Sequence, residues 1–179
     1  MLGRQDAPEN FHGKQQERRP MNELVSIAEK IAVRLIERKQ TIAVAESSTG
    51  GLISAALLAV PGASAYFIGG GVIYTRDARR VLMDIPNETM KGIRSASEPY
   101  AKLLASQILT RLATDWGLSE TGAAGPTGNR YGDAAGHSCM ALAGPVEAVI
   151  TLETGSSDRQ ANMQAFAKAA LNLLLENLR

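Results

Sequence analysis

The segment over residues 46–51 is the first part of the sequence that could carry chemistry. It reads Glu46-Ser47-Ser48-Thr49-Gly50-Gly51 and follows a short apolar run. Where a strand gives way to a helix, backbone N–H groups can converge on an anion or a developing oxyanion, and a serine hydroxyl can serve as a nucleophile. The same residue types also cap ordinary helices, so both interpretations stay open here.

A second candidate segment is the glycine-rich stretch over residues 121–132. It reads Thr121-Gly122-Ala123-Ala124-Gly125-Pro126-Thr127-Gly128-Asn129-Arg130-Tyr131-Gly132. We interpret it as a loop, because it is too rich in glycine for regular structure and too long for a tight turn; long ordered loops are often functional. Arg130 and Tyr131 could pair with and stack on a nucleotide, and a solvated loop is the alternative.

Two other reactive side chains favour structural roles. His137 follows a glycine, and nothing in the sequence brings it to Ser47, so we expect a surface or hydrogen-bonded strand residue. Cys139 lies in a predicted buried strand and is expected to be a small core residue. With a single cysteine and no Cys/His cluster at zinc-ligand spacing, the sequence predicts no disulfide, no metal and no cofactor.

Alternating helical and strand patterns must position these segments. Apolar residues recur at helical spacing from Leu24 to Leu35, and the run from Thr41 to Ala45 is typical of a buried strand. Further patterns predict a helix over 52–59, a strand over 66–74 interrupted by Gly69-Gly70-Gly71, helices from Thr75 to Leu82 and from Ser97 to about Trp116-Gly117, a hairpin of 138–142 and 146–152, and a last helix from Asp158 to about Leu178. This order predicts an α/β fold, a three-layer sandwich with a mixed sheet flanked by helices. The three glycines indicate a bulge or a close approach of another backbone, with ligand contact as the alternative.

Length and charge limit the class of protein. The 179 residues suit one domain over residues 21–179, preceded by a polar, aperiodic stretch over residues 1–20 that we expect to be a flexible tail. A formal net charge of +1 gives no field that would attract nucleic acid or an anionic membrane. No apolar stretch reaches the roughly 18 residues that cross a bilayer. Because the single cysteine cannot form an intramolecular disulfide, we expect a cytoplasmic protein.

Five short motifs together resemble the C-terminal domain of the CinA family, the nicotinamide-nucleotide amidases. They occur in the family's order and at nearly its spacing: residues 46–51, 61–67, 74–75, 97–99 and 121–126. The resemblance runs from about Leu24 to the C-terminus and is closest to the stand-alone form of the domain. It implies metal-free hydrolysis of the carboxamide of nicotinamide mononucleotide (NMN), which gives nicotinic acid mononucleotide and ammonia. It also implies a homo-oligomer that binds a small pyridine nucleotide.

The resemblance assigns roles to particular residues. Ser47 takes the place of the family nucleophile, and Tyr74 matches a retained family tyrosine. Arg159 stands in Ser157-Asp158-Arg159, similar to the family's Gly-Asp-Arg, and would contact phosphate or carboxamide; an exposed arginine in the first turn of the last helix is the alternative. The remaining positions implied to shape the oxyanion site or support the substrate are Thr49, Gly50, Gly51, Thr121, Gly122 and Gly125.

One position departs from the family at the catalytic base. The family pattern Tyr-Ser-Asn-Glu-x-Lys corresponds to Tyr74-Thr75-Arg76-Asp77-Ala78-Arg79, so arginine replaces the lysine that accepts the serine proton. Arginine stays charged in proteins, so Arg79 could act only as an electrostatic helper, through the pKa of Ser47 or by binding a phosphate. The loop also carries Gly128-Asn129 and Asp133-Ala134 where the family has Gly-Gly and Lys-Pro.

Three hypotheses follow from this departure. The chain could be a nicotinamide-nucleotide amidase, a catalytically silent paralogue that binds a nucleotide or another phosphorylated ligand, or a hydrolase of a different amide or phosphorylated substrate. The arginine at position 79 favours the second and third hypotheses, and the order of the motifs favours the first.

Overall fold

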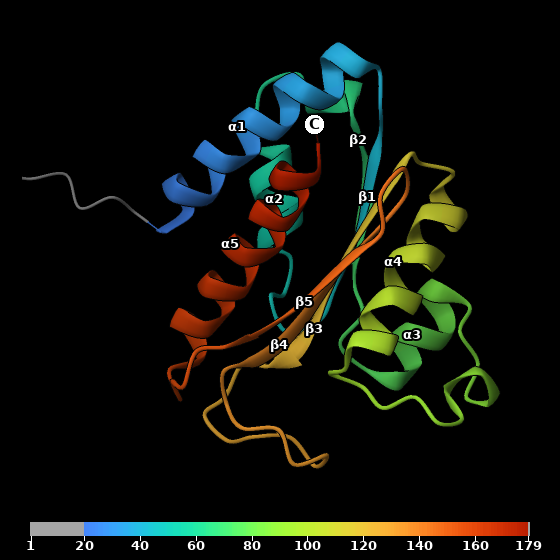
Figure 1. Ribbon diagram of the computed structural model, residues 1–179, viewed down its shortest axis with the longest axis vertical. Helices are drawn as coiled ribbons and strands as arrows, with labels where there is room; N and C mark the ends of the chain where they lie inside the picture. The colour runs from blue at the N-terminus through green and yellow to red at the C-terminus, as the bar shows by residue number, and fades with distance from the viewer. Residues whose placement is uncertain (1–19, 179) are drawn as a thin grey trace, which may run out of the picture.

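The computed structural model describes residues 20–178, and in it a five-stranded mixed sheet lies between two layers of helices (Figure 1). The helices are α1 Pro20–Arg38, α2 Leu52–Leu58, α3 Arg76–Met83, α4 Glu98–Leu112 and α5 Arg159–Asn177, and the strands are β1 Ile42–Glu46, β2 Phe67–Val72, β3 Trp116–Ala123, β4 His137–Ala143 and β5 Ala148–Glu153. Short 3-10 helices span Ala63–Ala65 and Glu88–Met90. The predicted three-layer α/β sandwich is confirmed.

The order of the strands brings three loops to one edge of the sheet. The order is β2-β1-β3-β4-β5, with β1 parallel to both β2 and β3, whereas β4 and β5 run antiparallel. The loops that follow β1, β2 and β3 therefore leave the sheet on the same side. In open α/β sheets, ligands bind outside the carboxyl ends of the parallel strands.

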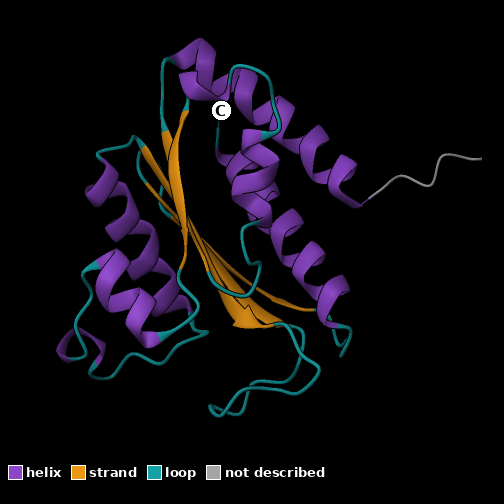
Figure 2. Ribbon diagram, turned by 180° about the vertical axis from the view of Figure 1, so that it is seen from behind, coloured by secondary structure: helices purple, strands orange, loops and turns teal. Residues whose placement is uncertain are grey.

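Two cores hold the layers together, and β1 shows why. Ile42 and Val44 pack with α1, α2 and α5 on one face, whereas Ala43 and Ala45 pack beneath α3 and α4 on the other. Successive side chains of a strand point to opposite faces, so a strand covered on both faces is apolar throughout. Figure 2 shows the two helical layers on either side of the sheet from behind.

The predicted capping residues begin their helices as expected. The side chain of Thr75 accepts a hydrogen bond from Ala78 N at the start of α3, and Ser97 accepts one from Tyr100 N at the start of α4. Asp158 does the same for α5 by accepting from Ala161 N. These caps fix the positions of the loops that precede them.

Two expectations about the middle of the chain are wrong. The helix from Ser97 ends at Leu112, and Trp116-Gly117 begins β3. Thr121, Gly122 and Ala123, expected in a loop, are the last residues of that strand. Small residues suit this strand because α4 packs closely on it: a Cβ at Gly117 would lie 2.1 Å from the Ala105 carbonyl oxygen.

The glycines of β2 have a packing role, as predicted. A Cβ at Gly70 would lie 2.3 Å from Ser54 Oγ and 3.2 Å from Val44 O, so α2 and β1 approach the strand closely here. At the N-terminal end, residues 1–19 of the predicted tail lie outside the described residues, while Pro20 already begins α1. None of the described helices is long and apolar enough to pass through a bilayer.

Candidate functional site

The loop between β1 and α2 is held from below by Glu46, the last residue of β1. Its carboxylate is fully buried and accepts hydrogen bonds from Gly51 N at 3.0 Å, Ile53 N at 3.0 Å and Ser54 N at 2.8 Å. These donors belong to the first turn of α2 and the residue before it. A carboxylate here satisfies N–H groups that have no partner within the helix and complements the helix dipole.

A second buried carboxylate, Glu120 of β3, holds the other half of the same loop. It accepts from Ser47 N at 3.1 Å, from Thr49 N at 2.9 Å and Thr49 Oγ1 at 3.0 Å, and from Ser138 Oγ at 2.8 Å, and it also accepts the Ser48 hydroxyl. Thr49 Oγ1 also lies 2.8 Å from Glu46 Oε2, so one hydroxyl links the two glutamates. The loop is therefore anchored from the sheet and leaves Ser47 on its outer side.

Ser47 opens onto a cavity of about 320 Å³ at the carboxyl edge of the sheet. Its hydroxyl makes no hydrogen bond with any residue that the structure describes, in contrast to the hydroxyls of Ser48 and Thr49. This serine cavity is lined by residues from all three loops at that edge, including Ser47, Tyr74, Arg76, Arg79, Tyr100, Thr121, Gly122, Arg130 and Tyr131. A volume of this size is within the range of small-molecule sites.

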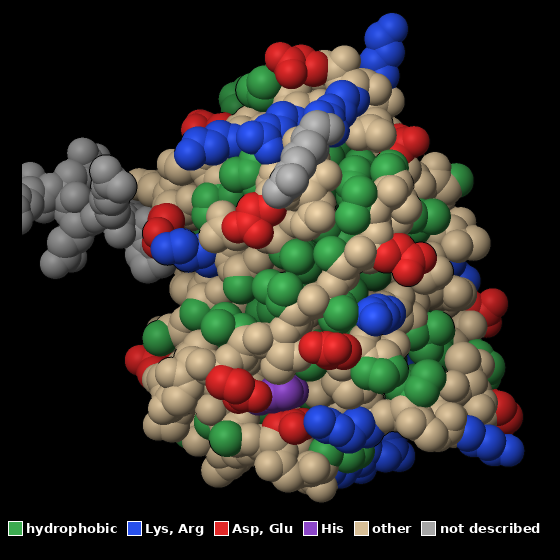
Figure 3. Space-filling view, in the orientation of Figure 1, with side chains coloured by type: hydrophobic (Ala, Val, Ile, Leu, Met, Phe, Trp, Pro, Cys, Tyr) green, Lys and Arg blue, Asp and Glu red, His purple; other side chains and the backbone are tan. Residues whose placement is uncertain are grey.

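A second cavity of about 520 Å³ adjoins the first, and we call it the arginine cavity. The two share Arg76, Arg79, Ser95 and Tyr131. The second cavity adds four residues of the chain segment between α3 and α4, together with Arg94: Asn87, Met90, Gly92 and Ile93. No aspartate or glutamate lines either cavity among the described residues, whereas four arginines do. In the space-filling view, basic side chains gather at this lower end of the molecule (Figure 3).

Arg79 is the most buried of these arginines, with 5% of its surface exposed. Its Nε donates to Ile85 O at 3.2 Å, and its Nη2 donates to Asn87 Oδ1. Both acceptors are neutral, and no described carboxylate forms an ion pair with this guanidinium. Arg79 thus brings an uncompensated positive charge to the boundary of the two cavities.

The titratable groups that line the serine cavity are tyrosines, apart from the arginines. Burial raises the pKa of Tyr100 to about 12, so its phenol stays protonated. Hydrogen bonds from Ser95 and Arg130 lower the pKa of Tyr131, and a further one comes from Arg76. Arg130 Nη2 donates to the Tyr131 hydroxyl at 2.8 Å. These contacts favour the ionised form of Tyr131 more than burial opposes it.

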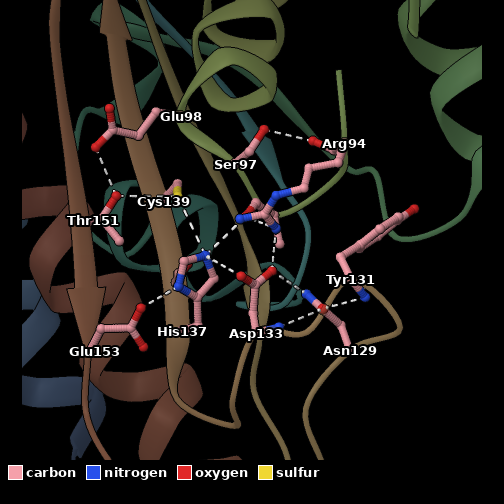
Figure 4. Close-up of polar contacts among 12 residues, drawn as sticks. Arg94, Ser97, Glu98, Asn129, Tyr131, Asp133, His137, Cys139, Thr151 and Glu153 are labelled. Carbon is pink, nitrogen blue, oxygen red and sulfur yellow. Dashed lines mark hydrogen bonds and ion pairs between the residues drawn. The ribbon is translucent and has the colours of Figure 1, made fainter. Parts of the chain in front are cut away.

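A network of polar contacts closes the glycine-rich loop beside the cavities (Figure 4). The Asn129 side chain accepts from Tyr131 N at 2.9 Å and Asp133 N at 3.2 Å, and it donates to Asp133 Oδ2 at 2.8 Å. Asp133 also pairs with Arg94 from the opposite segment. The residues that replace the family's Gly-Gly and Lys-Pro thus form the contacts that shape this loop.

Comparisons with known proteins identify the family to which this fold belongs. Residues 24–178 match the family model described as the CinA C-terminal domain. A CinA-like protein of Chlorobium limicola is 38% identical over 82% of this chain, and one of Chlorobaculum tepidum is 36% identical over 87%. The matched part is 35% and 38% of those two proteins, so the chain spans little more than a third of their length.

Solved structures show the same fold. A CinA superfamily protein of Klebsiella pneumoniae superposes with a TM-score of 0.81 at 27% identity, covering 87% of this chain and 97% of that one. The competence/damage inducible protein CihA of Agrobacterium tumefaciens gives 0.78 at 28% identity, covering 86% and 94%. This chain belongs to the CinA C-terminal domain family.

The family positions named from the sequence fall into two groups within this CinA domain. Ser47, Tyr74, Arg79, Thr121 and Gly122 line the serine cavity together. Arg159 and Gly125 lie beside it, because Arg159 Nη1 donates to Gly125 O at 2.7 Å and its Nη2 donates to the Tyr74 hydroxyl at 3.3 Å. Their chemical roles remain predictions.

Thr49, Gly50 and Gly51 lie on the loop but do not line either cavity. Thr49 is fully buried and its N–H and hydroxyl face Glu120, while the N–H of Gly51 faces Glu46. Gly50 and Gly51 adopt positive φ angles of 64° and 101°, which favours glycine at both positions. This geometry suits residues that position Ser47 rather than residues that contact a substrate.

His137 of the CinA domain is a hydrogen-bonded strand residue, as expected, and it lines neither the serine cavity nor the arginine cavity. Its Nε2 lies 2.9 Å from Ala96 O and its Nδ1 contacts Glu153, so both ring nitrogens are occupied. Cys139 is buried, with its Sγ 3.4 Å from Thr151 Oγ1, and burial raises the pKa of the thiol. Among residues 20–178, no group of three or more His, Cys, Asp or Glu side chains is arranged to hold a metal ion.

Sequence reasoning missed Glu120. It lies in β3, where no strand was expected, two residues after Leu118 and four after Trp116. The side chains of those two residues face the core formed with α1, α2 and α5. That alternation could have placed its side chain on the same face as Glu46. Nothing in the sequence near Glu120 indicates that its carboxylate accepts hydrogen bonds from residues 47–49.

Proposed function

We propose that this domain hydrolyses the carboxamide of a pyridine mononucleotide, with Ser47 as the nucleophile. The observation that carries the proposal is the Ser47 hydroxyl, which is unpartnered among the described residues and opens on a cavity lined by arginines and no acid. Arginines suit the phosphate of a nucleotide. Membership of the CinA family supports the same reaction.

The chemistry needs a proton acceptor that is not lysine. In the proposed reaction Ser47 Oγ attacks the carboxamide carbon and its proton passes to an acceptor, which returns the proton to the amide nitrogen as the C–N bond breaks and ammonia leaves. Water then cleaves the ester, which gives the carboxylic acid and restores the Ser47 hydroxyl. The candidate acceptor is Tyr131 in its ionised form: it lines the serine cavity together with Ser47, and hydrogen bonds from Ser95 and Arg130 lower its pKa. Burial makes Tyr100 a poor acceptor, since its pKa is raised to about 12.

A binding protein without turnover is the second candidate function. It is favoured by a specific observation: no described His, Lys, Asp or Glu lines the serine cavity. In that case the pocket would retain its nucleotide while the reaction had been lost. Homo-oligomerisation and a cytoplasmic location remain predictions under either function.

Ammonia release from NMN separates the two candidates. We expect the purified protein to release ammonia, Ser47→Ala to abolish release without a change in melting temperature, and Tyr131→Phe to slow it by about 10²–10⁴-fold, the usual contribution of general acid–base catalysis. Ser48→Ala provides the contrast, because the Ser48 hydroxyl donates to Glu120 and its loss should lower the melting temperature.

The outcomes of these assays test the nucleophile and distinguish the two candidate functions. Full activity in Ser47→Ala would rule out the nucleophile. A wild-type protein that is stabilised by NMN but releases no ammonia would establish the binding function, since a ligand bound only by the folded state raises the melting temperature. In that case, ammonia release by Arg79→Lys would show that only the proton acceptor had been lost.

A further inference from the structure

The charge of Arg79 is the feature of the molecule that no assigned role explains. Its side chain is 5% exposed, and none of the described ion pairs includes it. Burying a cation without a counter-charge is unfavourable unless another group compensates it. Arg94, which lines the arginine cavity with Arg79, has such a partner in Asp133.

The donors of Arg79 are only partly used. Nε and Nη2 are bonded to Ile85 O and Asn87 Oδ1, which fix the plane of the guanidinium. Nη1 has no described hydrogen-bond partner. Among the described residues, the only fully buried side-chain nitrogen or oxygen without a hydrogen-bond partner is Gln164 Oε1. Nη1 of Arg79 is therefore not fully buried. The free edge of the fork is therefore accessible from the cavities that Arg79 lines.

The surroundings of that free edge favour an anion. Arg76 stands beside it in both cavities, and neither cavity has an acidic residue in its described lining. Arg130 lies with its guanidinium carbon 5.0 Å from the centroid of the Tyr131 ring, so the wall of the serine cavity adds a third cation. A preorganised guanidinium at such a site matches two oxygens of a phosphate with parallel N–H groups.

We propose that the arginine cavity is a subsite for a phosphate monoester, with Arg79 as its principal contact and Arg76 beside it. The inference rests on the proposed function only for the other end of the ligand, whose amide would reach Ser47 in the adjoining serine cavity. Position 79 then binds the substrate rather than accepting a proton. Its replacement by lysine would keep the charge but lose the fork.

Binding of ribose 5-phosphate and of ribose tests the subsite without any chemistry. The two ligands differ by the phosphate, and calorimetry at fixed ionic strength gives both affinities. We expect the wild-type protein to bind the phosphorylated sugar more tightly by roughly 10–100-fold, the range that follows from hydrogen bonds to charged groups. Arg79→Met should remove most of this preference, and Arg79→Lys should remove part of it.

The matched control is Arg80→Met, on the same helix. Arg80 is exposed and pairs only with Asp77 at the surface, so its loss should leave the preference unchanged. If Arg79→Met does not fold, because Ile85 O and Asn87 lose their donor, Arg79→Lys and Arg76→Met carry the test. Equal affinities for the two ligands in the wild-type protein would overturn the subsite, and so would an undiminished preference in the folded Arg79 variants.

The result is separable from the proposed function. A phosphate preference that depends on Arg79, found in a protein that releases no ammonia from NMN, would establish the subsite and remove the amidase. Ammonia release by a protein with no phosphate preference would do the reverse.

Discussion

On one side of the serine cavity lies the loop over residues 47–51, and on the other lie the segments that carry Arg76, Arg79 and Arg130. Most of the N–H and O–H donors of the loop point inward, to Glu46 and Glu120, whereas the Ser47 hydroxyl faces the cavity. The arginine side has a buried guanidinium that receives only neutral acceptors from the protein. Most polar groups of the loop thus have partners within the protein. On the other side, which we call the arginine wall (Arg76, Arg79 and Arg130), the buried guanidinium has no counter-charge.

This difference separates a positioning element from a binding element. Buried polar groups that satisfy one another make a segment rigid and contribute to stability. A buried cation without a counter-charge contributes little to stability, and its compensation can come from a ligand. Variants of the loop should therefore act first on the free energy of unfolding, and variants of the arginine wall should act first on affinity.

Glu120→Ala should produce the largest effect on stability. It removes the acceptor for two backbone N–H groups and three hydroxyls in a site with no access to water. We expect the free energy of unfolding to fall by about 3–5 kcal/mol, because donors left unsatisfied in the interior carry their full desolvation cost. Urea denaturation of the variant and the wild-type protein measures the difference.

The control is Glu147→Ala, at an exposed position between β4 and β5. Its effect should stay within about 0.5 kcal/mol, as for most surface substitutions. A loss below about 1 kcal/mol in Glu120→Ala would contradict the view that the loop is held from the sheet.

The role of Glu120 is an example of a feature that the sequence did not predict, because it depends on contacts between distant segments. Periodicity and capping residues predicted the layers, four of the five strands and every helix of more than three residues, because those signals are local. β3 was missed since its sequence is small and polar rather than β-branched. Its glycines fit the close approach of other elements: a Cβ at Gly122 would lie 2.5 Å from His137 O. Contacts of that kind arise only in the folded chain.

In the candidate site, too, the sequence predicted which residues take part but not the contacts that orient them. The order of the motifs placed Ser47, Tyr74, Arg79, Thr121 and Gly122 around one cavity. It did not show that Thr49 and Gly51 face inward, because the direction of an N–H group in a loop depends on the acceptor it finds. That acceptor lies on a different strand for Thr49, far away in the sequence.

Asn129→Ala should have a moderate effect on stability, and it tests the side of the serine cavity that carries Arg130 and Tyr131. Asn129 links Tyr131 N, Asp133 N and Asp133 Oδ2 within the glycine-rich loop. We expect the free energy of unfolding to fall by only about 1 kcal/mol, since these bonds are partly solvated. The rate of ammonia release should fall more clearly than stability, because the loop carries Tyr131. A loss of stability as large as that of Glu120→Ala would remove the distinction between the two regions.

The smallest effect should be a pH dependence that originates beside the arginine wall. Burial lowers the pKa of His137, but contacts with Glu153 and the Ala96 carbonyl and the charge of Asp133 outweigh it, so the net pKa is raised. Both ring nitrogens face oxygen acceptors, which favours the protonated ring. Cys139 Sγ lies 3.7 Å from Nε2. Arg94 pairs with Asp133, and Asp133 in turn pairs with the ring.

The sign follows from the raised pKa. The folded state binds the proton more tightly than the unfolded chain, whose histidine titrates near 6.5, so the stabilisation is complete below that pH and is lost as pH rises through the folded pKa. We expect the wild-type protein to lose up to about 1 kcal/mol relative to His137→Gln between pH 6 and pH 8, a value typical of partly exposed ion pairs. Urea denaturation of both proteins across this range measures the difference. Parallel pH profiles would show that the proton bound by His137 does not contribute to the stability of the folded state over this range.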